Sequence, residues 1–133
     1  VGTRPFPGMP ELLAALGARG LRWGVVTNKP ARLTEPLLQA LGLWDAAACV
    51  VSGDTVARSK PDPAPMLHAC RLAACAPGEC LYVGDAERDV QAGRNAHMRT
   101  LVATFGYIGE EDDPTAWGAD GLVDAPADVL GWL

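Results

Sequence analysis

The feature that most constrains the fold is a strand, a turn and a helix predicted over residues 80–96. The run Cys80–Val83 is short, apolar and contains Tyr and Val, which is typical of a buried strand. Gly84 ends the run, Asp85 follows directly, and a helical pattern begins near Glu87. We therefore expect Asp85 at the carboxyl end of a strand, which is the edge where open α/β sheets bind ligands.

Asp89 comes four residues after Asp85, in the first turn of the predicted helix. Two carboxylates there would suit a hard cation such as magnesium, which takes a few carboxylate oxygens together with water and a substrate phosphate. The alternative is purely structural: Asp85 would cap the helix, and Asp89 would favour the positive end of its dipole. This stretch by itself favours neither interpretation.

Size and charge limit the classes of function. A chain of 133 residues with 49% hydrophobic and 20% charged residues is typical of one globular domain, here residues 1–133. Its net charge of −5 argues against a protein that binds nucleic acid or a membrane surface, because such a protein needs a basic face. There is no run of 18 apolar residues that would predict a membrane span. A phosphate substrate would need a few placed donors and a cation, since the overall field repels it.

The four cysteines are Cys49, Cys70, Cys75 and Cys80. Their spacing matches no zinc pattern such as Cys-x₂-Cys. Cys49 and Cys80 fall in apolar strand-like runs, where a free cysteine behaves as a small hydrophobic residue. We therefore expect reduced, structural thiols in a cytoplasmic protein, and we see no signal-peptide pattern.

Predicted helices and strands alternate along the chain. Helices are predicted over residues 10–17, 31–41, 63–74, 87–96 and 127–130, and strands over 23–27, 48–52, 80–83, 100–104 and 121–123. Strands alternating with helices of about ten residues indicate βα units and a parallel sheet.

The helix predicted over residues 31–41 contains Pro36. A proline in a helix interior removes a hydrogen bond and clashes with the preceding turn, so we expect a kink or a restart, with Thr34 capping the second part. The predicted apolar face is formed by Leu33, Leu37, Leu38 and Leu41.

Three of the predicted strands are followed by polar residues: Thr27-Asn28, Ser59-Lys60 and Asp85. The carboxyl ends of parallel strands share one edge of the sheet, so these residues should come together. They offer a hydroxyl, backbone N–H groups, an ammonium and carboxylates. That combination suits a phosphoryl group that carries a magnesium ion.

Each of these residues also has a simpler interpretation. Thr27 could form only a local turn bond, and Lys60, in a proline-rich loop, could be an ordinary solvated lysine. Lys29 is expected to be exposed. His68 and His97 are single histidines without a partner in the sequence.

The same residues resemble a known family. Thr27-Asn28-Lys29-Pro30, Ser59-Lys60-Pro61-Asp62-Pro63 and Gly84-Asp85-Ala86-Glu87-Arg88-Asp89 look like motifs II, III and IV of the haloacid dehalogenase superfamily, in the expected order. The branch that the chain resembles is the phosphoglycolate phosphatase-like hydrolases. The residues of its motifs also resemble those of the N-acetylmuramic acid 6-phosphate phosphatases. The resemblance covers nearly the whole chain.

The resemblance implies a role for each matching residue. Thr27 would bond a phosphoryl oxygen, assisted by the backbone N–H of Asn28. Lys60 would stabilise the phosphate and the aspartyl nucleophile of the family. Asp85 would ligate Mg²⁺ directly, and Asp89 would support the metal site directly or through water.

The chain departs from the family pattern in one major respect. The nucleophile and the general acid/base of the family are two aspartates in an Asp-x-Asp-Gly motif after the first strand, and this motif does not occur here. Val1 begins where the cap domain of the family returns to the core. We therefore expect residues 1–133 to be the C-terminal part of a hydrolase core, without the first strand and the cap. A smaller departure is His97, where the resemblance predicts a glycine that ends the helix.

The absent strand affects the expected fold. In this family it lies at the centre of the sheet, between the strands predicted over residues 23–27 and 80–83. Without it, those strands must pair with each other, leave a gap or recruit a partner. Unpaired buried backbone groups cost about 1–3 kcal/mol each, so we expect poor stability or self-association through the gap.

The resemblance thus implies a Rossmann-like α/β fold with a parallel sheet, incomplete at its N-terminus, and magnesium-dependent hydrolysis of a small phosphate monoester by the intact enzyme. We expect no turnover from the 133 residues alone. Two alternatives remain: a non-catalytic α/β module that binds phosphate or a partner, and a phosphomutase of the same superfamily. The expected partner is a small phosphorylated substrate, with neither nucleic acid nor membrane.

Overall fold

A computed structural model describes residues 8–58, 60–105 and 113–133, so Ser59 lies outside the described residues. Helices and strands alternate, as predicted, and their bounds follow in chain order: α1 Met9–Ala18, β1 Val25–Val26, α2 Ala31–Ala40, β2 Val50–Val51, α3 Ala64–Ala73, β3 Leu81–Gly84, α4 Glu87–Asn95, β4 Arg99–Ala103 and β5 Gly121–Val123. Three short 3₁₀ helices complete the order: η1 Pro77–Glu79, η2 Pro114–Ala116 and η3 Pro126–Trp132, the last in place of the helix predicted over residues 127–130.

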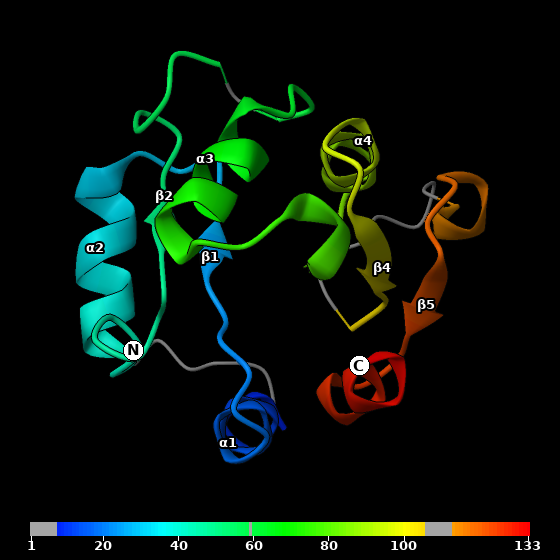
Figure 1. Cartoon of the computed structure of the whole chain (residues 1–133), viewed down its shortest axis with the longest axis horizontal. Coiled ribbons are helices and arrows are strands. Elements are labelled where there is room, and N and C mark those ends of the chain that lie inside the picture. Colours follow the sequence, from blue (N-terminus) through cyan, green and yellow to red (C-terminus); the bar gives the residue numbers. More distant parts are fainter. Residues whose placement is uncertain (1–7, 59, 106–112) are drawn as a thin grey trace.

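The strands form two parallel sheets, with the orders β1-β2 and β3-β4-β5 (Figure 1). Every pairing is parallel. In the register of these pairings, Val25 lies opposite Val50, and Leu101 lies opposite Val83 and Gly121. β1 and β3 belong to different sheets. Of the three expected outcomes for these two strands, the described part of the chain therefore shows the gap.

The side chains of β3 alternate between two hydrophobic cores because successive residues of a strand point to opposite faces of the sheet. Leu81 and Val83 pack into a core with α1 and η3. Cys80 and Tyr82 pack into a second core with α3 and α4. The three-stranded sheet is therefore covered on both faces, which explains why β3 reads as a continuous apolar run.

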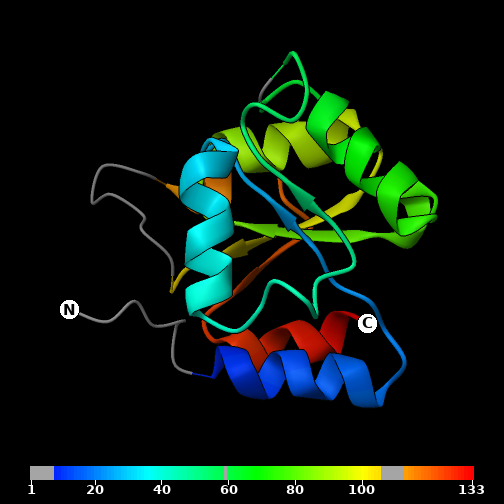
Figure 2. The same cartoon turned by 90° about the vertical axis from the view of Figure 1, so that its left-hand side faces the viewer.

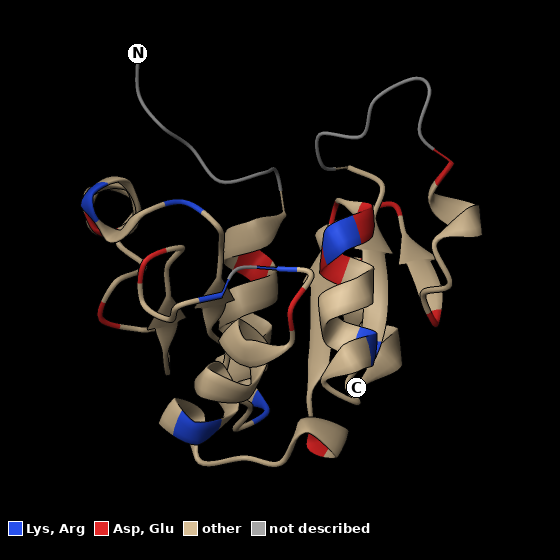
Figure 3. Ribbon diagram, turned by 90° about the horizontal axis from the view of Figure 1, so that it is seen from above, with Lys and Arg blue, Asp and Glu red and all other residues tan. Residues whose placement is uncertain are grey.

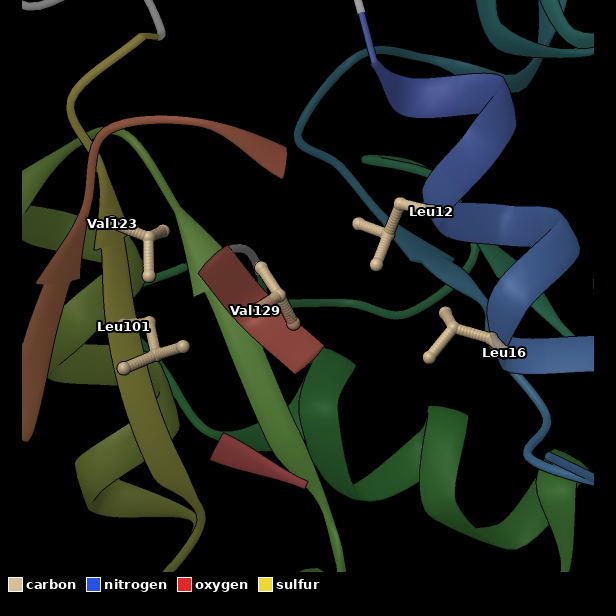
Figure 4. Close-up of a cluster of buried hydrophobic side chains, with 5 residues drawn as sticks. All are labelled: Leu12, Leu16, Leu101, Val123 and Val129. Carbon is tan, nitrogen blue, oxygen red and sulfur yellow. The ribbon is translucent and has the colours of Figure 1, made fainter. Parts of the chain in front are cut away.

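The first core is formed by α1, η3 and the three-stranded sheet. α1 and η3 contact one another and run side by side (Figure 2). Its buried side chains come from all three parts and are shown in Figure 4: Leu12, Leu16, Leu101, Val123 and Val129. This core attaches the N-terminal helix to the C-terminal end of the described chain.

The second core lets α4 approach the sheet closely. Ala92 and Ala96 are fully buried, and a Cβ built on Gly93 would lie 2.4 Å from Cγ2 of Thr100 on β4. Any larger residue at position 93 would push α4 away from the sheet. Gly93 therefore helps to fix the helix whose first turn carries Asp89.

The structure corrects the expected restart of α2, its expected cap and part of its expected apolar face. The helix is continuous through Pro36, and Thr34 does not cap a second segment; its hydroxyl donates to the carbonyl of Pro30 at 3.2 Å. Leu33, expected on the apolar face, is 51% exposed, while Thr34 is buried. Because a carbonyl satisfies its hydroxyl, Thr34 can occupy a core position that the apolar pattern alone would not assign.

Charged positions are interspersed along the described chain, and no basic face stands out in Figure 3. None of the helices in the described ranges is long and apolar enough to cross a bilayer.

Within the described residues, each of the four α-helices is followed by a residue with positive φ, and two of these residues, Ala74 and His97, are not glycine. At the end of α4, His97 has φ 65°, its N–H donates to Arg94 O at 3.0 Å, and Met98 N–H donates to Gly93 O at 2.9 Å. This is the Schellman arrangement, in which glycine is usual. His97 thus adopts the backbone conformation of the glycine that the resemblance implies at this position.

Replacing His97 with glycine should raise the free energy of unfolding by about 1 kcal/mol, because glycine adopts positive φ without a Cβ clash. His97 is exposed, so little packing is lost. Denaturant unfolding measures the change. The reverse control is Gly42→Ala just after α2, where φ is 73° and an added Cβ meets nothing within 4 Å. This substitution should lower the free energy of unfolding by a similar amount. A destabilised His97→Gly variant would contradict this account of the helix end.

The open edges of β1 and β3 predict self-association. Val25 N–H bonds Cys49 O of the β2 segment, so the polar groups of Val26 face the other way, toward β3. We expect sedimentation at micromolar concentration to show species heavier than 13.9 kDa that dissociate on dilution. A monomer with a cooperative melting transition above about 45–65 °C would contradict the expectation.

Candidate functional site

Lys60 lies at the centre of the candidate site and is only 8% exposed. Its ammonium Nζ donates to Asp89 Oδ1 at 2.5 Å, to the Tyr82 hydroxyl at 2.8 Å and to the Val26 carbonyl at 3.4 Å. The interpretation of Lys60 as a solvated lysine is therefore wrong. These contacts join the loop that follows β2 to β1, to β3 and to α4.

Asp89 is buried and uses both carboxylate oxygens. Oδ1 accepts from Lys60, while Oδ2 accepts from the backbone N–H groups of Asp85 at 3.0 Å and Ala86 at 3.1 Å. A Cβ on Gly84 would lie 2.6 Å from Asp89 Oδ2, so a residue with a side chain at position 84 would not leave room for this carboxylate. Asp89 thus closes the turn between β3 and α4.

Asp85 follows the last residue of β3, as predicted, and is half-buried. The residue in the N-cap position of α4 is Ala86, so the alternative in which Asp85 caps the helix is wrong. The pKa of Tyr82 is raised, first by burial and then by the negative charges of Asp89 and Asp85. Tyr82 therefore keeps its phenol proton at neutral pH and donates a hydrogen bond to Val26 O at 3.1 Å.

Thr27 and Asn28 lie directly after β1, and both are half-buried. The Thr27 hydroxyl accepts from the backbone N–H of Lys29 at 3.2 Å, which is the local turn bond considered above. This bond uses an acceptor lone pair, so the hydroxyl retains its proton for another acceptor. Lys29 is exposed, as expected.

The Asn28 side chain holds the backbone of Lys60. Asn28 Oδ1 accepts from Lys60 N–H at 3.2 Å, and its Nδ2 donates to Lys60 O at 3.5 Å. The amide therefore connects the turn after β1 to the loop after β2. It positions Lys60 from the backbone side, while Asp89 holds the ammonium.

The sequence pattern missed Tyr82 and the side chain of Asn28. Tyr82 was assigned only to a buried strand, yet its hydroxyl contacts Lys60, and its ring centroid lies 5.4 Å from Lys60 Nζ. One signal was available: Tyr buries its ring but needs a partner for its hydroxyl, and Tyr82 comes three residues before Asp85. The amide contact of Asn28 has no comparable signal in the sequence.

The donor set around Asp85 fits a magnesium ion that takes one protein carboxylate and completes its shell with water and phosphate oxygens. Both oxygens of Asp89 already accept hydrogen bonds, so this geometry favours the supporting role for Asp89. The described residues hold no group of three carboxylates or histidines near Asp85 that would form an all-protein cage.

Replacing Asp89 with asparagine should lower the free energy of unfolding by about 3–5 kcal/mol, because the Lys60 ammonium would stay buried without its counter-charge. Glu87→Gln is the matched control: it makes the same chemical change at an exposed position of the same helix turn and should cost less than about 0.5 kcal/mol. Denaturant unfolding compares the two. Equal effects would show that the ion pair does not stabilise the fold.

Known proteins resemble this chain in sequence over almost its whole length. The chain is 48% identical over 131 residues to the N-acetylmuramic acid 6-phosphate phosphatase of Pseudomonas aeruginosa. The aligned region covers 98% of the chain and 58% of the relative. It is 44% identical over 124 residues to the phosphoglycolate phosphatase of Xylella fastidiosa Temecula1, covering 93% of the chain and 54% of the relative. The chain thus spans somewhat more than half the length of these relatives.

Solved structures agree with the sequence comparison. The crystal structure of a predicted phosphoglycolate phosphatase from Haemophilus somnus superposes with a TM-score of 0.88 at 31% identity, over 96% of this chain and 56% of that one. The sequence model of the haloacid dehalogenase-like hydrolases matches residues 2–103, which include Thr27, Lys60, Asp85 and Asp89. The chain therefore belongs to the haloacid dehalogenase-like hydrolase family.

Proposed function

We propose that this chain supplies the phosphate- and magnesium-binding part of a phosphatase that hydrolyses a small phosphate monoester. The observation that carries the proposal is the convergence of three polar segments on Lys60. Asn28 holds the Lys60 backbone, Asp89 holds its ammonium, and Asp89 also orients the turn that presents Asp85. A preorganised cation next to a carboxylate is what a metal-bound phosphoryl group requires.

Each residue would have a distinct part in binding. Lys60 would exchange its longest contact, 3.4 Å to the Val26 carbonyl, for a phosphoryl oxygen while keeping Asp89. The Thr27 hydroxyl would donate to a second phosphoryl oxygen, with the Asn28 backbone N–H beside it. Asp85 would ligate magnesium, which when bound neutralises phosphoryl charge.

The covalent step needs a group that residues 1–133 do not contain. Members of the family attack phosphorus with an aspartate of an Asp-x-Asp-Gly motif, and no such motif occurs in the sequence. We therefore propose that the 133 residues by themselves bind a phosphorylated ligand without turning it over.

The relatives suggest the substrate and the compartment. N-acetylmuramic acid 6-phosphate, which is a sugar phosphate, and phosphoglycolate are the substrates named for them, and we propose one of these for the whole enzyme. All four cysteines are free thiols, which supports a reducing, cytoplasmic location.

The chain should bind inorganic phosphate in the presence of Mg²⁺ and release none from either candidate substrate. Isothermal titration measures binding, and a phosphate-release assay measures turnover. Asp85→Ala should abolish the magnesium-dependent binding by removing the metal ligand. The control Asp45→Ala removes an exposed carboxylate that follows α2 and should leave binding unchanged.

The two measurements separate the candidate functions. Phosphate release that is lost on Asp85→Ala would overturn the proposed inactivity and show that the chain carries its own nucleophile. Binding without release, both here and in a longer protein that contains the chain, would favour the non-catalytic module. Absence of binding would overturn the assignment of the site.

A further inference from the structure

Three of the four cysteines meet at the amino end of β3. Cys70 lies in the last turn of α3, Cys75 follows that helix, and Cys80 directly precedes β3. Their sulfur atoms all lie within 4.8 Å of one another. Sγ of Cys80 is 3.2 Å from Sγ of Cys75 and 3.8 Å from Sγ of Cys70, and all three are free thiols.

Backbone hydrogen bonds hold this cluster in place. Ala74 adopts φ 56°, and Cys75 N–H donates to Cys70 O at 3.0 Å, so the chain reverses direction at the end of α3. The 3₁₀ helix η1 then turns it again, with Cys80 N–H donating to Pro77 O at 3.0 Å. The three thiols are therefore brought together by the fold itself, without a disulfide between them.

The spacing of the sulfurs matches that of thiolate ligands around one metal ion. With Zn–S bonds of about 2.3 Å, tetrahedral geometry separates two sulfurs by about 3.8 Å and trigonal geometry by about 4.0 Å. The sulfurs of Cys70 and Cys80 are 3.8 Å apart, and the sulfur of Cys75, 3.2 Å from that of Cys80, would need to move away from it by about 0.6 Å to reach the tetrahedral spacing. An ion could thus bind without rearrangement of the backbone.

The cluster is open to solvent on one side. Cys70 and Cys75 line a surface depression together with Leu67, Arg71, Pro77 and Glu79. Cys75 and Cys80 are half-buried residues, and the depression gives an ion a route to the cluster from the side of Cys70 and Cys75. The open side leaves a fourth position for water, as in zinc sites that have three protein ligands.

We propose that Cys70, Cys75 and Cys80 form a three-thiolate site for a thiophilic metal ion of the Zn²⁺ class. Binding forms three metal–sulfur bonds and releases the three thiol protons to solvent, and nothing is oxidised or reduced. Sulfur ligands select such ions over Mg²⁺, which prefers oxygen. Five residues of extended chain separate Cys80 from Asp85, about 16 Å, so the two sites lie at opposite ends of β3.

Burial favours the protonated thiols of Cys70 and Cys80 when no metal is bound. Burial, and after it the neighbouring thiols of Cys75 and Cys70, raise the pKa of Cys80 to about 12, and burial is the largest cause of the raised pKa of Cys70. Protonated thiols resist oxidation because the thiolate is the reactive form. A metal ion, by contrast, deprotonates a thiol that coordinates it.

The test titrates the reduced chain with Cd²⁺, whose thiolate complexes absorb in the ultraviolet, and with Zn²⁺ in equilibrium dialysis. We expect one ion per chain. Replacing Cys70, Cys75 or Cys80 with serine, one at a time, should lower the thiolate absorption by about a third and weaken Zn²⁺ binding at least about tenfold. Circular dichroism confirms that each variant is folded.

Cys49→Ser is the matched control, because it makes the same chemical change at a cysteine outside the cluster. The sulfur of Cys49 lies next to Gly24. It should leave the stoichiometry and the absorption unchanged. No thiolate absorption in the wild-type chain would overturn the site. So would an equal loss in Cys49→Ser, or a mass two hydrogens lighter that shows a disulfide in the reduced, metal-treated protein.

Discussion

The buried ion pair between Lys60 and Asp89 is the interaction on which the arrangement of the site depends. Each side chain is only 6% exposed. Burying either charge without the other would cost a large free energy. Lys60 belongs to the loop that follows the two-stranded sheet, whereas Asp89 belongs to a helix that packs on the three-stranded sheet. The pair therefore joins two halves of the molecule that share no strand pairing within the described residues.

The same contacts close the carboxyl end of the gap between the sheets. The carbonyl of Val26 faces this gap and accepts from both Tyr82 and Lys60. Any strand that paired with this edge of β1 would use that carbonyl as an acceptor for one of its own N–H groups. Its insertion would displace Tyr82 and Lys60 from Val26, while the bond from Lys60 to Asp89 could remain. Completion of the sheet would thus favour the same exchange of the Val26 carbonyl for a phosphoryl oxygen that phosphate binding to Lys60 requires.

The sequence was sufficient for what depends on local pattern. Alternating strands and helices and the place of Asp85 after β3 follow from neighbouring residues, whereas the special backbone of His97 was suggested only by the family resemblance. It could not show which neighbours in space satisfy a polar side chain. Lys60 can be buried because Asp89 Oδ1, from a residue 29 positions away in the chain, accepts a hydrogen bond from its Nζ at 2.5 Å. Thr34 enters the core for the same kind of reason, since a carbonyl satisfies its hydroxyl.

The cysteine cluster was missed because its spacing is ordinary and its geometry comes from a turn at Ala74 that sequence rules assign to glycine. The position of α3 gives the cluster its wider meaning. This helix begins four residues after Lys60 and ends in the turn that gathers the sulfurs. Asp62 fixes its first turn by accepting from Ala64 N–H at 2.8 Å. A metal ion held by Cys70 and Cys75 would fix the other end, so α3 would be restrained at both termini and the Lys60 loop would be anchored to a more rigid support.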